Sequence, residues 1–304
     1  MSRRFRSDLS ISDEFGDRMD QLADTCDGLV DACVEVASSS QASNSQFASE
    51  ASLFRKEYPQ AEKNVEYAPA HAATAYADVL RHQLASISAL LQAREVVGTL
   101  WPIVRAQLET AGRVVWLLDP ELEQPAGKAR VARYYLEAIS SFQRAGFTHS
   151  KYDRAAEKAY KAERSAKIAA ATSLFPDFEL ELGSPDLIAD WKLGGEPMLG
   201  LGAGANLFAK RLLSGPGKAL YDILSDYSHP SLVSIESQTR LVDDGKVASH
   251  PWVVPVDFVE HQCRWACTIL YKTYQLASEY LGVDPAALER WADGAPADWF
   301  DPVT

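Results

Sequence analysis

The residues with the clearest capacity for chemistry stand at four-residue steps in one apolar stretch, residues 100–120. Arg105, Glu109 and Arg113 interrupt a segment that is apolar on almost every other side, so on a helix they form one stripe. A helix of this kind is usually buried, and charges on a buried helix must be paired. Arg105 and Glu109 are spaced to pair within the helix, in the Arg-then-Glu order that is the weaker one for a plain surface pair. An arginine here can hold a phosphate or a developing negative charge.

A second set of candidate residues closes the helix predicted at residues 217–228. The chain there reads Asp226-Tyr227-Ser228-His229 and then Pro230, which stops the helix. His229 therefore lies at or just past a helix C-terminus, where the helix dipole favours a protonated imidazole. Imidazole titrates near neutral pH and serves as a general acid or base. Arg105, Glu109 and His229 are our candidate catalytic residues, and Arg113, Asp226, Tyr227 and Ser228 are candidate substrate-binding residues.

The elements that must position these residues are helices. Apolar residues recur at three- and four-residue steps, no fixed-period repeat occurs, and no consistent alternation of strands and helices is present. The pattern predicts an all-α protein with its main bundle at residues 68–282. Pro102 and the pair Asp119-Pro120 bound the central helix, and the short turn at Gly98-Thr99 predicts that it packs antiparallel on the helix before it. The predicted helices cover residues 11–37, 47–58, 68–98, 100–118, 126–147, 151–171, 217–228, 256–281 and 285–291.

The N-terminal region has the composition of an extension. Residues 1–10 are expected to be disordered, and the polar run at residues 38–45 is rich in serine, which is typical of a flexible linker. We therefore divide the chain into residues 1–46, with a tail, a helix and a linker, and residues 47–304, the helical bundle domain. The helix at residues 11–37 is then an appendage or an oligomerisation arm, and it and the helix at residues 68–98 are the candidate contact surfaces of a homodimer.

Glycines punctuate residues 194–204, ahead of a helix predicted from about Asn206. The segment lacks the Gly-Lys-Ser/Thr ending of a phosphate-binding P-loop and the strand that must precede it. We interpret it as a mobile loop or lid. Further along, valines flank the turn at Asp243-Asp244-Gly245 and predict a short hairpin of residues 239–242 against residues 246–248.

The segment at residues 151–171 is strongly charged, with opposite charges four residues apart, as in Glu157 with Lys161 and Glu163 with Lys167. This pattern is typical of a solvated helix. A helix that binds nucleic acid would not interleave acidic residues so evenly.

Composition excludes several classes of protein. The 304 residues include 30 basic and 42 acidic ones, a net charge of −12, which argues against general DNA binding because such affinity comes from neutralising phosphates. No apolar segment follows the basic N-terminus, and no uncharged apolar run is long enough to cross a bilayer, so we expect a cytoplasmic protein with no membrane partner.

The four cysteines are best explained as buried free thiols. Cys26 and Cys33 stand seven residues apart, and Cys263 and Cys267 stand four apart, each pair on one face of a predicted helix. Neither pair has the spacing of a zinc site, and a free cysteine behaves as a small core residue. We expect no metal site and no cofactor.

Two short motifs carry a resemblance to a known group. Arg105-Ala-Gln-Leu-Glu109 is followed by Tyr221 and then by Leu224-Ser-Asp-Tyr-Ser-His229-Pro230. This resembles a group of uncharacterised bacterial all-helical proteins, which are distantly similar to the HEPN superfamily. The resemblance covers about residues 75–280. It implies a HEPN-like bundle, often dimeric, and either metal-independent RNA cleavage or RNA or nucleotide binding, as in bacterial defence and toxin–antitoxin systems.

The sequence also departs from the superfamily signature, in which an arginine stands four to six residues before the histidine. Those positions hold Ile223, Leu224 and Ser225, so the cation must come from another helix, through Arg105 or Arg113. Three functional hypotheses follow. In the first, the protein is a ribonuclease with His229 as general base and Arg105 as phosphate clamp. In the second, it is a regulator that binds a small molecule or nucleotide under the glycine-rich lid. In the third, Arg105, Glu109 and His229 form a buried polar network that fixes helix register.

Overall fold

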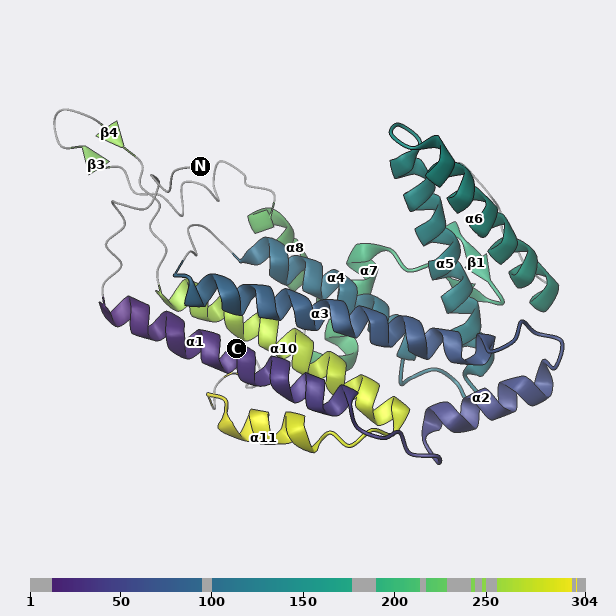
Figure 1. The fold of residues 1–304 in the computed structure, drawn as a ribbon, viewed down its shortest axis with the longest axis horizontal. Coiled ribbons are helices and arrows are strands. Elements are labelled where there is room, and N and C mark those ends of the chain that lie inside the picture. The colour runs from purple at the N-terminus through teal and green to yellow at the C-terminus, as the bar shows by residue number, and fades with distance from the viewer. Residues whose placement is uncertain are drawn as a thin grey trace.

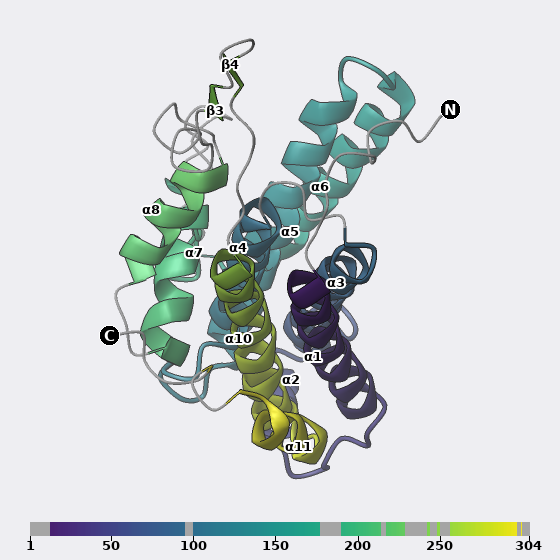
Figure 2. The ribbon, with the colours of Figure 1, turned by 90° about the vertical axis from the view of Figure 1, so that its left-hand side faces the viewer.

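The computed structural model describes residues 13–94, 100–176, 190–213, 217–228, 242–243, 248–249, 256–296 and 299. Its architecture is all-α, as predicted (Figure 1). Four long helices lie side by side as a bundle: α1 (Asp13–Ala37), α3 (Ala68–Gln92), α4 (Trp101–Leu118) and α10 (Val256–Leu281), a grouping that Figure 2 shows from the end. α3 and α4 pack against each other as the antiparallel pair that their short connection predicted (Figure 1).

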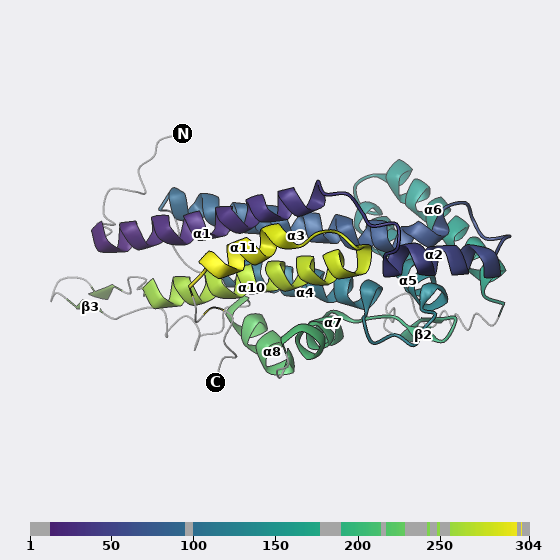
Figure 3. The ribbon, with the colours of Figure 1, turned by 90° about the horizontal axis from the view of Figure 1, so that it is seen from below.

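Shorter elements surround the bundle. α2 (Gln46–Glu57) and the 3₁₀ turn η1 (Val65–Tyr67) lie at one end, and α11 (Ala286–Gly294) packs on α1, as Figure 3 shows from below. α7 (Leu201–Phe208), the π-helical turn η3 (Ala209–Leu213) and α8 (Gly217–Ser228) cover α4. The strands β3 (Val242–Asp243) and β4 (Ala248–Ser249) pair antiparallel, which confirms the predicted hairpin with strands that are shorter and begin two to three residues later.

The expectation of an N-terminal helical extension is wrong, because α1 is part of the core. Met19, Leu22, Cys26, Leu29 and Cys33 are at most 2% exposed and belong to the same apolar cluster as the helices of the bundle. α1 packs along α3, α10 and α11. A surface helix buries an apolar stripe of this kind only against a partner, and here α3 and α10 supply it.

The serine-rich segment is docked rather than free. The backbone N–H of Ala42 donates to the carbonyl of Gly282 over 2.9 Å, and the Ser45 hydroxyl caps α2 by accepting from the N–H of Ala48. Gly282 adopts a positive φ of 67°, and a Cβ there would stand 2.7 Å from the Cβ of Ser45. The polar composition that predicted a linker therefore reflects a turn and a helix cap.

α5 (Gly127–His149) and α6 (Arg154–Leu174) form a hairpin that projects from the bundle (Figure 1). The prediction that α6 is a solvated helix is confirmed: its only buried residues are Ala171 and Leu174, near its end. Glu157 pairs with Lys161 over 2.5 Å, as its spacing predicted. Lys167 bonds instead to Glu62, over 3.3 Å.

Most of the glycine-rich segment is a β-hairpin and a helix, with only residues 198–200 irregular, which corrects the predicted lid. Gly194 and Gly195, both with positive φ, turn a small hairpin of β1 (Lys192–Leu193) and β2 (Glu196–Pro197). Gly202 and Gly204 lie inside α7. Each glycine lowers the stability of the helix by about 1 kcal/mol relative to alanine, but it allows the two helices to approach closely. A Cβ on Gly112 of α4 would stand only 2.5 Å from the carbonyl carbon of Gly204.

All four cysteines are free and buried, as predicted. The Sγ atoms of Cys26 on α1 and Cys267 on α10 lie 3.8 Å apart, and burial raises the pKa of Cys33. No helix in the described part of the chain has the length and apolarity needed to cross a membrane.

The glycine contact between α4 and α7 predicts a stability effect. Gly112→Ala adds a methyl group where the backbone of Gly204 leaves no room, so we expect the free energy of unfolding to fall by about 1–3 kcal/mol in urea titration. Gly294→Ala is the matched control, because a Cβ at Gly294 meets nothing within 4 Å. Equal stability of the two variants would contradict the close approach.

Candidate functional site

The candidate site begins with the polar stripe on α4. Val104, Leu108 and Ala111 are fully buried, and Val114 and Val115 extend the buried surface of the same helix. Between these, the side chains of Arg105, Glu109 and Arg113 are only about a fifth exposed, at 18%, 21% and 21%. The expectation that charges on this helix are paired is confirmed, but the stripe divides between two separate networks.

In the first network, Arg105 and Glu109 meet Tyr221 of α8 in a closed triangle. Arg105 Nε donates to Glu109 Oε1 over 2.9 Å, and Arg105 Nη2 donates to the Tyr221 hydroxyl over 3.3 Å. That hydroxyl donates to Glu109 Oε1, also over 3.3 Å. The Arg105 guanidinium lies 5.4 Å from the centre of the Tyr221 ring, within cation–π range. The two sequence motifs, 116 residues apart at Arg105 and Tyr221, are therefore in contact.

The triangle favours the charged form of Arg105. Burial alone would lower the pKa of the guanidinium, but the hydrogen bonds to Tyr221 and Glu109 and the nearby negative charge outweigh burial and raise that pKa. These hydrogen bonds involve Nε and Nη2 of Arg105, and Nη1 has no hydrogen-bond partner among the described residues. The triangle thus presents a permanent cation that is partly exposed and oriented by two neighbours.

Gly202 helps to hold Tyr221 in this position. A Cβ at Gly202 of α7 would stand 3.4 Å from Cε1 of the Tyr221 ring, so the glycine lets the ring lie close against α7. α7 in turn packs on α4 through Gly112 and Gly204. The glycines that sequence analysis assigned to a lid therefore position the tyrosine by close packing.

Arg113 belongs to the second network, which joins α4 to α5. Arg113 Nη1 bonds Glu137 Oε1 over 2.5 Å and the Tyr76 hydroxyl over 3.2 Å, and that hydroxyl donates to Glu137 over 2.7 Å. Arg144 reaches the same carboxylate over 3.2 Å. Burial, and then the charge of Glu137, raise the pKa of Tyr76. Arg113 is therefore held by a buried carboxylate rather than joined to Arg105.

The end of α8 holds the remaining candidates. Asp226 is exposed, and the Ser228 hydroxyl donates to the carbonyl of Leu224 over 2.6 Å, within its own helix. Seven residues separate Tyr221 from Ser228, so the helix end lies about 10 Å further along α8 than the triangle. The side chain of Tyr227, and His229 with Pro230, lie outside the described residues.

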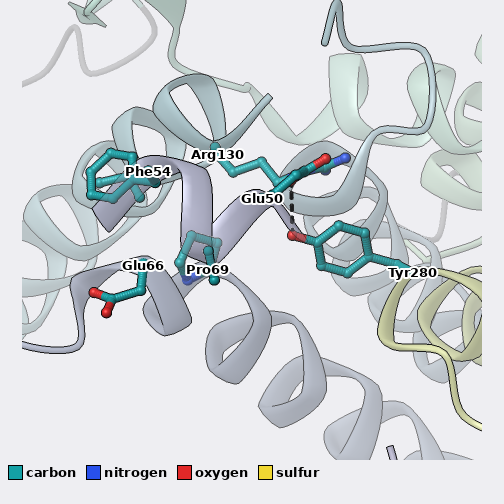
Figure 4. Close-up of a pocket in the computed structure, with 9 residues that line it drawn as sticks. Glu50, Phe54, Glu66, Pro69, Arg130 and Tyr280 are labelled. Atoms are coloured by element: carbon teal, nitrogen blue, oxygen red, sulfur yellow. Dashed lines mark hydrogen bonds and ion pairs between the residues drawn. The ribbon is translucent and has the colours of Figure 1, made fainter. Parts of the chain in front are cut away.

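Sequence analysis missed a third polar cluster, which is more deeply buried (Figure 4). Arg130 is 1% exposed; its Nε bonds Glu50 over 2.8 Å, and its other nitrogens bond the carbonyls of Leu117 and Asp119. Tyr280 donates to the same carboxylate over 3.1 Å. The adjoining cavity holds only about 10 Å³, which is room for a water molecule and not for a ligand. Its members come from three helices far apart in sequence, so no local signal marked them.

A larger groove of about 450 Å³ lies between α2, residues 41–43 and η1. It is lined by Phe47 and Tyr67 and by Arg55, which pairs with Glu66 on its wall. None of the predicted site residues borders it. Among the described residues, no group of three or more His, Cys, Asp and Glu side chains is arranged to hold a metal ion.

Comparison of the chain with protein-family models, with curated proteins and with solved structures gave no match. Functional inference therefore depends on the geometry of the residues themselves.

The Arg105 triangle and the Arg130 cluster differ in burial, and this predicts that their disruption will lower the free energy of unfolding by different amounts. Arg130→Met leaves the carboxylate of Glu50 buried and without its cation, so we expect a loss of about 3–5 kcal/mol of unfolding free energy. Arg105→Met removes a partly exposed pair and should cost about 1 kcal/mol or less. Urea denaturation of the two variants measures both values. A loss at Arg105 as large as that at Arg130 would favour a purely structural role for the triangle.

Proposed function

We propose that the protein is a HEPN-like helical protein that binds RNA at the junction of α4 and α8 and cleaves it without a metal ion. The observation that carries the proposal is the contact of Tyr221 with Arg105 and Glu109. This contact joins α4, which carries the R-x-x-x-E motif, to α8, which ends at Ser228, and it supports a shared surface for the two motifs. The resemblance also favours a role in bacterial defence or a toxin–antitoxin system.

The proposed chemistry needs one base and one fixed cation. His229 takes the proton of a ribose 2′-hydroxyl, and the oxygen attacks the adjacent phosphorus as the bond to the 5′-oxygen breaks. The leaving oxygen takes a proton from water, and the hydroxide that remains takes the proton from His229, which restores the neutral imidazole. The products are a 2′,3′-cyclic phosphate and a 5′-hydroxyl. Arg105 is the phosphate clamp: it binds a phosphate of the same strand, about 10 Å along α8 from the helix end that leads to His229. Glu109 and Tyr221 orient the guanidinium, which takes the place of the arginine that the superfamily has before its histidine.

A cleavage assay tests the proposal. Wild-type protein is incubated with 5′-labelled single-stranded RNA in EDTA, and the product ends are identified by mass spectrometry. We expect cleavage with cyclic phosphate ends, a rate at least about 100-fold lower for His229→Ala, and a loss of about 10- to 1,000-fold for Arg105→Met. Tyr221→Phe should give a smaller loss, because it keeps the ring and removes only the hydroxyl.

Matched controls separate this site from general effects. His82→Ala removes an exposed histidine on α3, and Arg290→Met removes an arginine that is 62% exposed in its pair with Glu35. Both should cleave at the wild-type rate. No cleavage by the wild-type protein, or equal cleavage by His229→Ala, would overturn the ribonuclease. RNA binding without cleavage would leave a degenerate RNA-binding member, and neither activity would favour a register-fixing network or a small-molecule regulator.

A further inference from the structure

The basic residues of this acidic protein are concentrated in one projecting hairpin. Residues 127–174, which form α5, α6 and their turn, hold 10 of the 30 Lys and Arg residues but only 4 of the 42 Asp and Glu residues. The hairpin therefore carries a formal net charge of +6 in a chain whose total is −12. Arg130, Arg133 and Lys167 pair with carboxylates outside the hairpin, so the cations left for a ligand lie toward its tip. A polyanion that is repelled by the rest of the molecule would be attracted to this element.

The tip of the hairpin also exposes aromatic rings. Phe147 is 69% exposed and Tyr152 is 85% exposed, the highest values among the large apolar side chains that the structure describes. Phe147 lies in the last turn of α5 and Tyr152 in the connection to α6, so both belong to the projecting end (Figure 1). Exposed rings among basic side chains are the arrangement on which the bases of a single strand stack.

The acidic residues near the tip are committed to local contacts. Asp153 caps α6 by accepting from the N–H groups of Ala155 and Ala156, and Glu157 pairs with Lys161. Arg154 and Lys158 stand four residues apart on one exposed face of α6, and no ion pair holds either of them within the described part of the chain. The interleaving of charges that argued against nucleic acid in the sequence therefore leaves a cationic face in the structure.

We propose that this hairpin tip binds single-stranded RNA, with Phe147 and Tyr152 stacking on bases and Lys151, Arg154 and Lys158 contacting phosphates. The inference rests on the proposed function for its choice of RNA as the polyanion. An anionic membrane fits less well, because a helix that lies on a bilayer presents a continuous apolar face, and the exposed residues of α6 are alanines interspersed with lysine, arginine, serine, threonine and Glu163.

The hairpin is joined to the α4 side of the proposed site. Glu137, which holds Arg113 of α4, lies ten residues before Phe147, about 15 Å along α5. α5 and α8 both pack against α4. RNA bound at the tip is therefore tethered near the Arg105 triangle, which raises its local concentration there.

Fluorescence anisotropy with a labelled 20-nucleotide oligo-uridine tests the inference in full-length protein that carries His229→Ala, so that cleavage does not interfere. Arg154→Glu with Lys158→Glu should weaken binding at least about tenfold and reduce its dependence on salt. Arg290→Glu with Lys56→Glu makes the same change of charge at exposed sites on α11 and α2, away from the hairpin tip, and should have less than about a twofold effect. Tyr152→Ala should also weaken binding about tenfold, without changing the salt dependence.

Three results would overturn the inference. The first is no binding of the oligonucleotide at 50 mM salt, and the second is equal binding by the hairpin variant and its control. The third is that the hairpin variant keeps its RNA binding but loses binding to phosphatidylserine vesicles that the parent protein shows. Cleavage by protein with an intact His229 is measured separately. If binding depends on the hairpin but no cleavage occurs, the proposed ribonuclease activity is wrong and the RNA-binding surface is supported. If the hairpin variant cleaves limiting RNA at the same rate as the wild-type protein, the RNA-binding surface is wrong and the ribonuclease activity is supported.

Discussion

The structure depends on satisfying the polar groups of α4, a helix that is buried on almost every side. Its charged side chains draw in two elements: Arg105 and Glu109 hold Tyr221 of α8, and Arg113 holds Glu137 of α5. The C-terminal end of α4 has carbonyl groups with no partner inside the helix. Arginines of α5 fill these positions, with Arg130 donating to Leu117 and Arg133 donating to Trp116. Cations at a helix C-terminus also complement its dipole. The packing of α5 and α8 on the bundle thus follows from polar groups on α4 that water reaches only in part.

Periodicity and helix-ending residues allowed most helices to be predicted, because these signals are local. The predicted bounds of α8 and α10 are those of the structure, and the pairing of Arg105 with Glu109 follows from a four-residue spacing. Partners across the fold carry no such signal. Glu137 and Arg130 were not recognised as partners, and the apolar stripe of α1 predicted a helix without revealing that it completes the core. The contact of Tyr221 with the α4 stripe emerged only from packing, although the residue stood in the motif that suggested the site.

The glycines of α7 show how one composition can arise from opposite causes. Glycine in a sequence signals either conformational freedom or the need for a small side chain, and the two cannot be distinguished without knowing what lies opposite. Gly194 and Gly195 have positive φ and turn a hairpin, whereas Gly202 and Gly204 are helical and face Tyr221 and Gly112. The second pair makes α7 a rigid support for the triangle. A site of this kind needs such support, because Arg105 is oriented only while Tyr221 stays within hydrogen-bonding distance of it.

Net charge misleads about partners for a similar reason, because it averages over surfaces that a ligand meets separately. At physiological ionic strength, charges are screened over about 8 Å. The hairpin tip extends from the bundle by more than this, since α5 alone has 23 residues and is about 35 Å long. A ligand at the tip therefore experiences chiefly the cations of α5 and α6 and little of the acidic surface elsewhere. Acidic surfaces on the remaining helices would then repel a polyanion that arrives in other orientations. The total of −12 is thus compatible with one cationic, aromatic surface, and it favours approach of a polyanion through that surface alone.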